Sequence, residues 1–179
     1  MSAPILLTER LKLRQYVMSD VEALVPLIGE REVAVTTLRI PHPYTEVDAR
    51  DFIGSVVSGD DVRLAIEIRE GQKLCGSVGL KVESADEHAE LGYWIGIPFW
   101  GQGYATEAAG ALLEYGFEML KLNRIFAHHF KNNPASGRVL EKIGMRHEGE
   151  MREHIKKWGK FVDLEIYGVL RSEWTKKKT

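Results

Sequence analysis

The chain has 179 residues, 44% of them hydrophobic, so it is long enough to bury a core, and its length fits a single domain over 1–179. The 24 Lys and Arg residues are balanced by 26 Asp and Glu residues, and the net charge of -2 argues against nucleic acid or an anionic membrane as a partner. Because there is one cysteine, no long apolar run and a charged N-terminal segment, we expect no disulfide, no membrane span and no signal peptide, and hence a cytoplasmic protein.

The first third of the chain predicts one strand and two helices. Leucines alternate with charged residues over 10–16, which is the period of a half-buried strand. A helical apolar repeat covers 21–30, and Pro26 should interrupt or kink that helix. A second short helix is expected within 43–57, with Thr45 in the position of an N-cap.

Three strands are expected in the middle of the chain. Strands over 61–70 and 73–82 are separated by Gly71 and Gln72, which predicts a hairpin turn, and a third strand covers 88–97. Cys75 lies in one of these apolar runs with no activating partner adjacent in sequence, so we expect a buried, unreactive thiol.

The C-terminal half predicts two more helices and three more strands. A helix follows residue 106, with an apolar face made of Ala108, Leu112, Gly116 and Met119. A strand with apolar residues on both faces covers 123–130, and a helix over 133–144 opens with Asn133 and Pro134. Strands over 147–155 and 161–170 form a last hairpin. The order of these elements predicts one mixed α/β layer fold.

The turn FWGQGYATEA, residues 99–108, has the composition of an anion-binding loop. Glycines let the backbone approach an anion, and the free N–H groups that open a helix point toward it. A P-loop would need lysine after Gly103, where Tyr104 stands. A dinucleotide fingerprint would need a third small residue where Thr106 stands, and the next strand ends in HHFK without the acid that binds a ribose. The pyrophosphate loop of an acyl-CoA binder and a plain left-handed glycine turn remain.

Five segments in the same order resemble the GNAT superfamily of N-acetyltransferases, within the RimJ/RimL branch of protein N-terminal acetyltransferases. They are TERLKLR at 8–14, PYTEVDA at 43–49, ELGYWI with WGQGYATEA at 90–108, NPASGRVLEKIGM at 133–145 and GKFVDLEIYGVLRSEW at 159–174. The resemblance implies a central mixed sheet of about seven strands, splayed between the fourth and fifth, with about four flanking helices. It also implies acetyl-CoA as co-substrate and no metal.

By this resemblance the glycine-rich turn holds the pyrophosphate of acetyl-CoA. The superfamily pattern begins with Gln or Arg, whereas Trp100 stands there, so the contacts should come mainly from backbone N–H groups of 102–106, with the hydroxyl of Thr106 in addition. The residues expected to bind this end of the co-substrate are Gly101, Gln102, Gly103, Tyr104, Ala105 and Thr106.

The resemblance also implies that the pantetheine arm lies between the two splayed strands. Trp94, Ile95 and Ile97 would line the arm, and a backbone N–H near Ile95 would face the thioester oxygen. Many family members use a tyrosine to protonate the leaving thiolate, but Leu140 occupies that position.

In the RimJ/RimL pattern an asparagine and a serine take over next to the pantetheine. Asn133 would then hydrogen-bond the arm and Ser136 would be the donor near the sulfur. Helix capping by Asn133 and an ordinary first-turn role for Ser136 are the structural alternatives.

The amine acceptor is predicted from proton chemistry. An α-amine with a pKa of about 7.7–8.0 is neutral far more often at pH 7 than a lysine with a pKa of about 10.4, so a modest base suits an N-terminus. Glu90 shares a strand face with Trp94 and is the candidate proton acceptor, although a solvated strand-edge glutamate has the same pattern. His128 and His129 are adjacent in a strand and point to opposite faces, so they cannot chelate one metal.

The sequence therefore predicts an acetyl-CoA-dependent N-acetyltransferase acting on a protein N-terminus. A small-molecule amine such as a polyamine or aminoglycoside is the rival acceptor, and a non-catalytic acyl-CoA sensor is the rival class. The final hairpin offers a surface for a homodimer.

Overall fold

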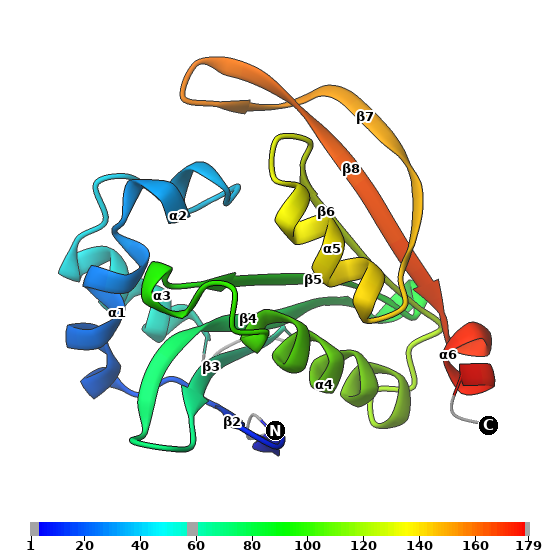
Figure 1. The fold of residues 1–179 in the computed structure, drawn as a ribbon, viewed down its shortest axis with the longest axis horizontal. Helices are drawn as coiled ribbons and strands as arrows, with labels where there is room; N and C mark the ends of the chain where they lie inside the picture. The colour runs from blue at the N-terminus through cyan, green and yellow to red at the C-terminus, as the bar shows by residue number, and fades with distance from the viewer. Residues whose placement is uncertain (1–3, 57–60, 178–179) are drawn as a thin grey trace.

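The computed structural model describes residues 4–56 and 61–177 (Figure 1). One eight-stranded sheet has the order β1-β2-β3-β4-β5-β6-β8-β7. Its strands are β1 (Leu6–Leu7), β2 (Leu11–Arg14), β3 (Val62–Ile68), β4 (Lys73–Glu83), β5 (His88–Ile95), β6 (Arg124–Phe130), β7 (Arg146–Lys157) and β8 (Lys160–Leu170). The helices are α1 (Val21–Ile28), α2 (Arg31–Val35), α3 (Glu46–Val56), α4 (Tyr104–Glu118), α5 (Pro134–Lys142) and α6 (Arg171–Lys177), with 3-10 turns η1 (Met18–Asp20), η2 (Ser84–Asp86) and η3 (Ile97–Phe99).

The mixed α/β architecture and the splay are confirmed. Within the described residues, the two-residue β1 adds to the strands expected from sequence, and α2 and α6 add to the helices. Strands β5 and β6 run parallel and pair only from His88–Arg124 to Glu90–Phe126. Beyond Glu90 the two strands diverge, and the gap between them opens toward the start of α4.

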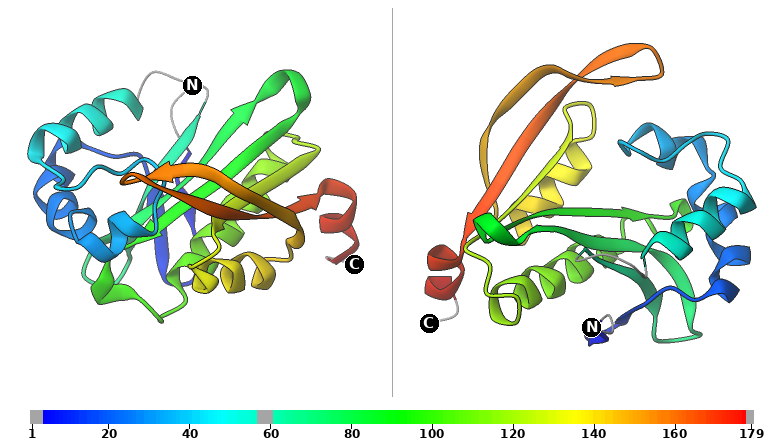
Figure 2. Two further views of the ribbon diagram at one scale, coloured as in Figure 1. Left: turned by 90° about the horizontal axis from the view of Figure 1, so that it is seen from above. Right: turned by 180° about the vertical axis from the view of Figure 1, so that it is seen from behind.

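Helices cover both faces of the sheet. One core cluster places α4 and α5 against the sheet through Leu112, Phe117 and Leu140, all 1% exposed or less. The other packs α1 and α3 against the opposite face through residues such as Leu24 and Ile53. In Figure 2 the β7–β8 hairpin crosses above the sheet toward the N-terminal helices.

Local turn chemistry explains the hairpins. Gly71 and Gln72 both have positive φ, 77° and 49°, and so do Trp158 and Gly159, at 47° and 81°. Trp158 and Gly159 form a two-residue turn between the paired Lys157 and Lys160, and two successive positive φ values match the twist of the flanking strands. The β3–β4 loop is longer: it covers 69–72, between the paired Ile68 and Lys73, and Gly71 and Gln72 are its last two residues.

Two details of the helices differ from the sequence expectation. Helix α1 continues through Pro26, which lies inside it. Met119 was expected on the buried face of α4 but is 68% exposed, because the helix ends one residue earlier, at Glu118. The thiol of Cys75 is fully buried as predicted, and burial raises its pKa to about 12.

Candidate active site

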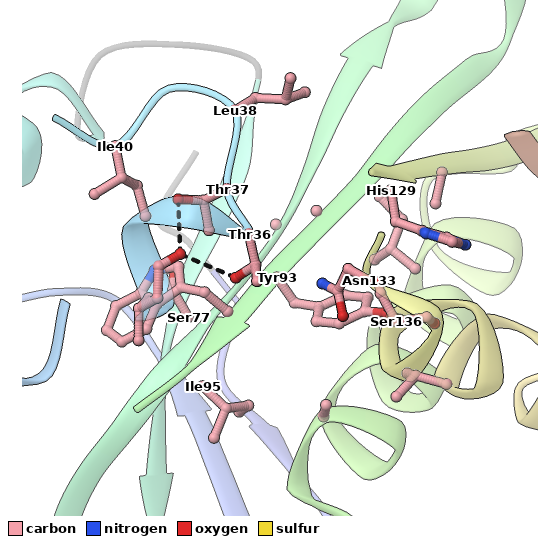
Figure 3. A pocket seen from close by; sticks show the side chains of 18 of the residues that line it. Thr36, Thr37, Leu38, Ile40, Ser77, Tyr93, Ile95, His129, Asn133 and Ser136 are labelled. Atoms are coloured by element: carbon pink, nitrogen blue, oxygen red, sulfur yellow. Dashed lines mark hydrogen bonds between the residues drawn. The ribbon is translucent and has the colours of Figure 1, made fainter. Parts of the chain in front are cut away.

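A cavity of about 1030 Å³ occupies the splay between β5 and β6. It extends from the first turn of α4, past the first turn of α5, to the segment 36–41 that follows α2. Figure 3 shows residues from these elements facing one pocket. The size is sufficient for a long flexible ligand, since ligand pockets are typically about 300–1,000 Å³.

The glycine-rich turn presents a row of free backbone N–H groups at one end of this cavity. Gly101 and Gly103 have φ values of 74° and 83°, which glycine adopts without a Cβ penalty. In the part of the chain that the structure describes, no group accepts a hydrogen bond from the amides of residues 101–106. The amide of Glu107 is the first to be bonded, to the carbonyl of Gly103 at 3.0 Å. These orphan donors and the positive end of the α4 dipole favour an anion.

The turn is braced by the segment before β2. Glu107, in the first turn of α4, accepts hydrogen bonds from Thr8 Oγ1 at 2.6 Å and from the Arg10 amide at 2.8 Å. Arg10 Nε donates to the same carboxylate at 2.7 Å, and its Nη1 donates to the carbonyl of Gln102 at 2.9 Å. Burial works against ionisation of Glu107, but the bonds from Thr8 and Arg10 lower its pKa. The bracing fixes the loop in the shape that exposes its amides.

Trp100, which departs from the superfamily pattern, ties this turn to the end of β5. Its indole Nε1 donates to the carbonyl of Ile95 at 2.7 Å. The amide of Gly96 donates to Cys75 in β4 at 2.9 Å. Because successive backbone groups of a strand point to opposite sides, the N–H of Ile95 is directed away from β4 and into the splay. This is the direction that a donor to a thioester oxygen would need.

Most of the residues expected from sequence lie together around the cavity. They are Glu90, Trp94, Ile95, Gly101, Gly103, Tyr104, Ala105, Thr106, Asn133 and Ser136. Two lie elsewhere. The side chain of Gln102 turns back to the carbonyl of Pro98 at 3.0 Å, and Ile97 starts η3 and packs against the cluster under α1 and α3.

The first turn of α5 supplies polar groups to the middle of the cavity. Asn133 occupies the N-cap position without a side-chain capping bond. Its backbone N–H donates to the carbonyl of Phe130 at 2.7 Å, whereas its side-chain amide has no partner among the described residues. Ser136 Oγ lies 2.7 Å from the hydroxyl of Tyr93, which comes from β5. Leu140 is fully buried in the core, so no hydroxyl is available there.

Sequence reasoning missed Tyr93. Strand alternation alone would have placed its side chain on the face opposite Glu90, toward α4 and α5. Burial raises the pKa of Tyr93 to about 12, against the opposing effect of its bond to Ser136.

An acid and a base face each other on the other wall of the cavity. The carboxylate of Glu90 lies 3.4 Å from Nε2 of His128. Burial is the main cause that lowers the pKa of His128, helped by His154 and Arg39 and opposed by Glu90. As expected, His129 points to the opposite face, where it is 7% exposed and contacts Phe130 and Tyr167.

The tip of the β7–β8 hairpin reaches the segment 36–41, which lines the cavity. Lys157 Nζ donates to the carbonyls of Thr37 at 2.7 Å and Ile40 at 3.3 Å. Its neighbour Trp158 packs beside the guanidinium of Arg31 and the ring of His42. The hairpin and the segment together form an arch, and Figure 2 shows the hairpin from above.

Among the described residues, no three His, Cys, Asp or Glu side chains gather in a way that could hold a metal ion. None of the helices described combines the length and the apolar character that crossing a membrane requires.

Comparison with known proteins agrees with the geometry. A family model described as an acetyltransferase (GNAT) domain matches residues 10–146. The chain is similar to a solved acetyltransferase of the GNAT family from Bacillus anthracis, with 29% identity, a TM-score of 0.86, and coverage of 94% of this chain and 99% of that one.

Two similar sequences carry names with different acceptors. The "Putative ribosomal N-acetyltransferase YdaF" of Bacillus subtilis is 38% identical over 59% of this chain and 58% of its own length. The "Spermidine N(1)-acetyltransferase" of Vibrio cholerae is 25% identical over 74% of this chain and 78% of its own length. Both names state an N-acetyltransferase. With its family-model match, its fold and its cleft, the chain belongs to the GNAT family of acetyltransferases.

Proposed function

We propose that this enzyme transfers the acetyl group of acetyl-CoA to the α-amine of a protein or peptide N-terminus, as in the RimJ/RimL branch. The observation that carries the proposal is the row of unbonded amides at 101–106, which opens into the cavity between β5 and β6. The amides are donors for a pyrophosphate, and the splay leaves room for the arm that carries the acetyl group.

In this proposal the co-substrate lies along the cavity from α4 to the acceptor wall. The amides of residues 102–106 hold the pyrophosphate, and the side-chain amide of Asn133 bonds the pantetheine. The unpaired backbone of β5 adds bonds to the arm as a neighbouring strand would. The N–H of Ile95 polarises the thioester carbonyl, and Ser136 stands next to the sulfur.

Proton chemistry favours an acceptor that is already partly neutral. Glu90 accepts the proton that the amine loses, directly or through water, with His128 beside it. At pH 7 an α-amine is easier to deprotonate than a lysine by about 2.5 pKa units, or about 3.5 kcal/mol. One partly exposed carboxylate and one histidine are a modest base, which suits the α-amine.

The arch supports a chain end as acceptor. Lys157 joins the hairpin to the 36–41 segment, and this segment lines the same cavity as Glu90. In this proposal an acceptor passes under the connection to reach Glu90. An extended N-terminus or a linear amine can do so, whereas a lysine on a folded surface is held back by the backbone around it.

The charge of the cavity wall distinguishes between the two linear acceptors, a peptide N-terminus and a polyamine. The acceptor side of the cavity carries the carboxylates of Asp48, Asp51 and Glu90, and these are matched by the cations Arg39, Arg63 and Lys81. A polyamine with several positive charges would gain from a surplus of carboxylates, which this wall does not offer. We therefore place polyamines and aminoglycosides second.

The test measures thiol release from acetyl-CoA with four acceptors. They are a short peptide with a free N-terminus, the same peptide blocked at its N-terminus and carrying an internal lysine, spermidine and an aminoglycoside. We expect turnover with the free N-terminus alone, and mass spectrometry should place the acetyl group on the α-amine. A faster reaction with spermidine would overturn the N-terminal acceptor and would indicate that the enzyme acetylates small amines.

Calorimetry with CoA tests the site itself. Binding at micromolar concentrations is expected, and its absence would overturn the enzyme proposal for this cleft. Binding of CoA without turnover of any amine would instead indicate the acyl-CoA sensor. A homodimer through the β7–β8 hairpin stays a prediction, which light scattering of the pure protein would test.

A further inference from the structure

The hydroxyl pair of Tyr93 and Ser136 joins β5 to α5 across the part of the cavity where the strands have separated. The two oxygens lie 2.7 Å apart, and either hydroxyl can donate to the other. The Tyr93 hydroxyl also donates to the backbone carbonyl of Ser136 at the longer distance of 3.1 Å. Both residues line the cavity, and Figure 3 shows the ring of Tyr93 extending toward Ser136. The pair is therefore positioned beside the middle of the cleft.

In the middle of the cleft, acetyl transfer requires a hydrogen-bond donor for the sulfur that leaves. When the C–S bond breaks, the sulfur leaves with the electron pair as a thiolate. Leu140 is fully buried and apolar, so it offers no donor. Ser136 brings a hydroxyl, but a serine in the first turn of a helix readily turns its proton to a nearby backbone carbonyl. A serine acts on the sulfur only if its proton is kept pointing into the cavity.

Resting on the function proposed above, we propose that Tyr93 is a positioning residue that directs the Ser136 hydroxyl at the leaving sulfur. Each of the two hydroxyls has one proton and accepts as well as donates. The proton of Tyr93 has two acceptors, and Ser136 Oγ at 2.7 Å is nearer than the Ser136 carbonyl at 3.1 Å. When Tyr93 donates to Oγ, Ser136 cannot donate its own proton back to Tyr93. That proton is then free to hydrogen-bond the sulfur, and the bond strengthens as the sulfur becomes charged.

The hydroxyls donate a hydrogen bond and keep their protons. The pKa of Tyr93, about 12, lies above the ordinary thiol value of about 8.5, so complete transfer from Tyr93 to the thiolate would be uphill. The reaction balances without it. The N–C bond forms, the C–S bond breaks, the amine proton passes to Glu90 and on to solvent, and the products are the amide, the CoA thiolate and one proton.

The experiment that tests this inference is an ultraviolet titration of the CoA thiol bound to the full-length protein. Thiolate absorption is followed against pH for the CoA complex, with the protein alone subtracted to remove tyrosine ionisation. The chain suits this measurement because its one cysteine, Cys75, is buried and has a pKa of about 12. We expect bound CoA to have a thiol pKa about one unit below that of free CoA.

Three variants decide the origin of that shift. Tyr93→Phe keeps the ring and removes the donor, so the thiol pKa should return most of the way to the free value. Ser136→Ala should do the same, and the double variant should be no different from Ser136→Ala. Tyr115→Phe, on α4 and outside the cavity lining, is the matched control and should leave the thiol pKa unchanged.

Turnover gives a second, independent reading. For Tyr93→Phe we expect kcat to fall about tenfold, with the KM for acetyl-CoA nearly unchanged, because the hydroxyl acts only on the developing thiolate. An unchanged thiol pKa in a Tyr93→Phe protein that still binds CoA would overturn the role of Tyr93 and leave the proposed function standing. Failure of the parent protein to bind CoA would overturn both.

Discussion

The carboxylate of Glu90 lies 3.4 Å from Nε2 of His128, and the two residues belong to strands that separate just beyond Glu90. The pairing of β5 with β6 therefore sets the distance between an acid and a base at the root of the cleft. Burial has already lowered the pKa of His128, and the charge of Glu90 is the main influence that opposes this.

Replacing Glu90 by Gln is expected to lower kcat/KM about 100-fold, because the amine then loses the proton acceptor that we propose for it. The pH profile should change as well. Removal of the negative charge lowers the pKa of His128 further, so any limb of the profile due to His128 should move to lower pH. Rates measured from pH 5 to 9 at saturating acetyl-CoA check both effects. An unchanged rate at pH 7 would remove Glu90 from the chemistry.

Replacing Glu107 by Gln should weaken CoA binding about tenfold. The carboxylate holds Thr8 and Arg10 against the glycine-rich turn, so its loss should loosen the amides that we propose as the pyrophosphate donors. Calorimetry with CoA measures the effect, and Glu114→Gln, further along α4, is the control. An unaltered Kd in a folded Glu107→Gln protein would mean that the turn keeps its shape unaided.

The brace should also respond to pH. Because the folded state lowers the pKa of Glu107, its contribution to stability is complete above the unfolded value of about 4.3 and is lost as the pH falls through the folded value. Denaturation curves at pH 7 and pH 4 should therefore differ less for Glu107→Gln than for the parent protein.

Replacing Lys157 by Ala should open the arch. The side chain loses its bonds to the carbonyls of Thr37 and Ile40, so the hairpin tip and the 36–41 segment separate more easily. We expect a higher KM for the N-terminal peptide and measurable acetylation of the blocked peptide with an internal lysine. Lys156→Ala is the control on the same hairpin, where Lys156 lies over the exposed ring of Phe161. Identical acceptor selectivity in the two variants would show that the arch does not select the acceptor.

Arg14 is predicted to be important for folding. It bonds Asp20 at 2.8 Å and Glu67 at 2.6 Å, and these two carboxylates are 7% and 8% exposed. Arg14→Met leaves the buried Asp20 carboxylate without a cationic partner and Glu67 with only the longer contact to Lys12 at 3.9 Å, so the free energy of unfolding should fall by about 3–5 kcal/mol. Urea denaturation measures the loss. Arg50→Met, which breaks an exposed pair with Glu46, should cost less than about 0.5 kcal/mol.

The order of the elements and the glycine-rich turn could be predicted from the sequence because their signals are local. Alternating leucines, positive-φ glycines and the opening of a helix each involve only a few neighbouring residues. The same local rules predicted less well at the ends of helices and at the edge of the sheet. They missed the short β1, the helices α2 and α6, and the exposure of Met119, since these depend on where neighbouring elements stop.

The sequence by itself determined a glycine-rich turn at the start of a helix and a polar first turn in α5, and its resemblance to a known family indicated the splayed pair of strands. Only the tertiary structure decided which side chains act together there. The hydrogen-bonded pairs are far apart in the sequence: 43 residues separate Tyr93 from Ser136. The separation is 97 residues for Arg10 and Glu107, and 120 residues for Lys157 and Thr37. The physical reason is that a side chain's partner depends on sheet register and on helix packing, and neither is encoded in the few residues around it.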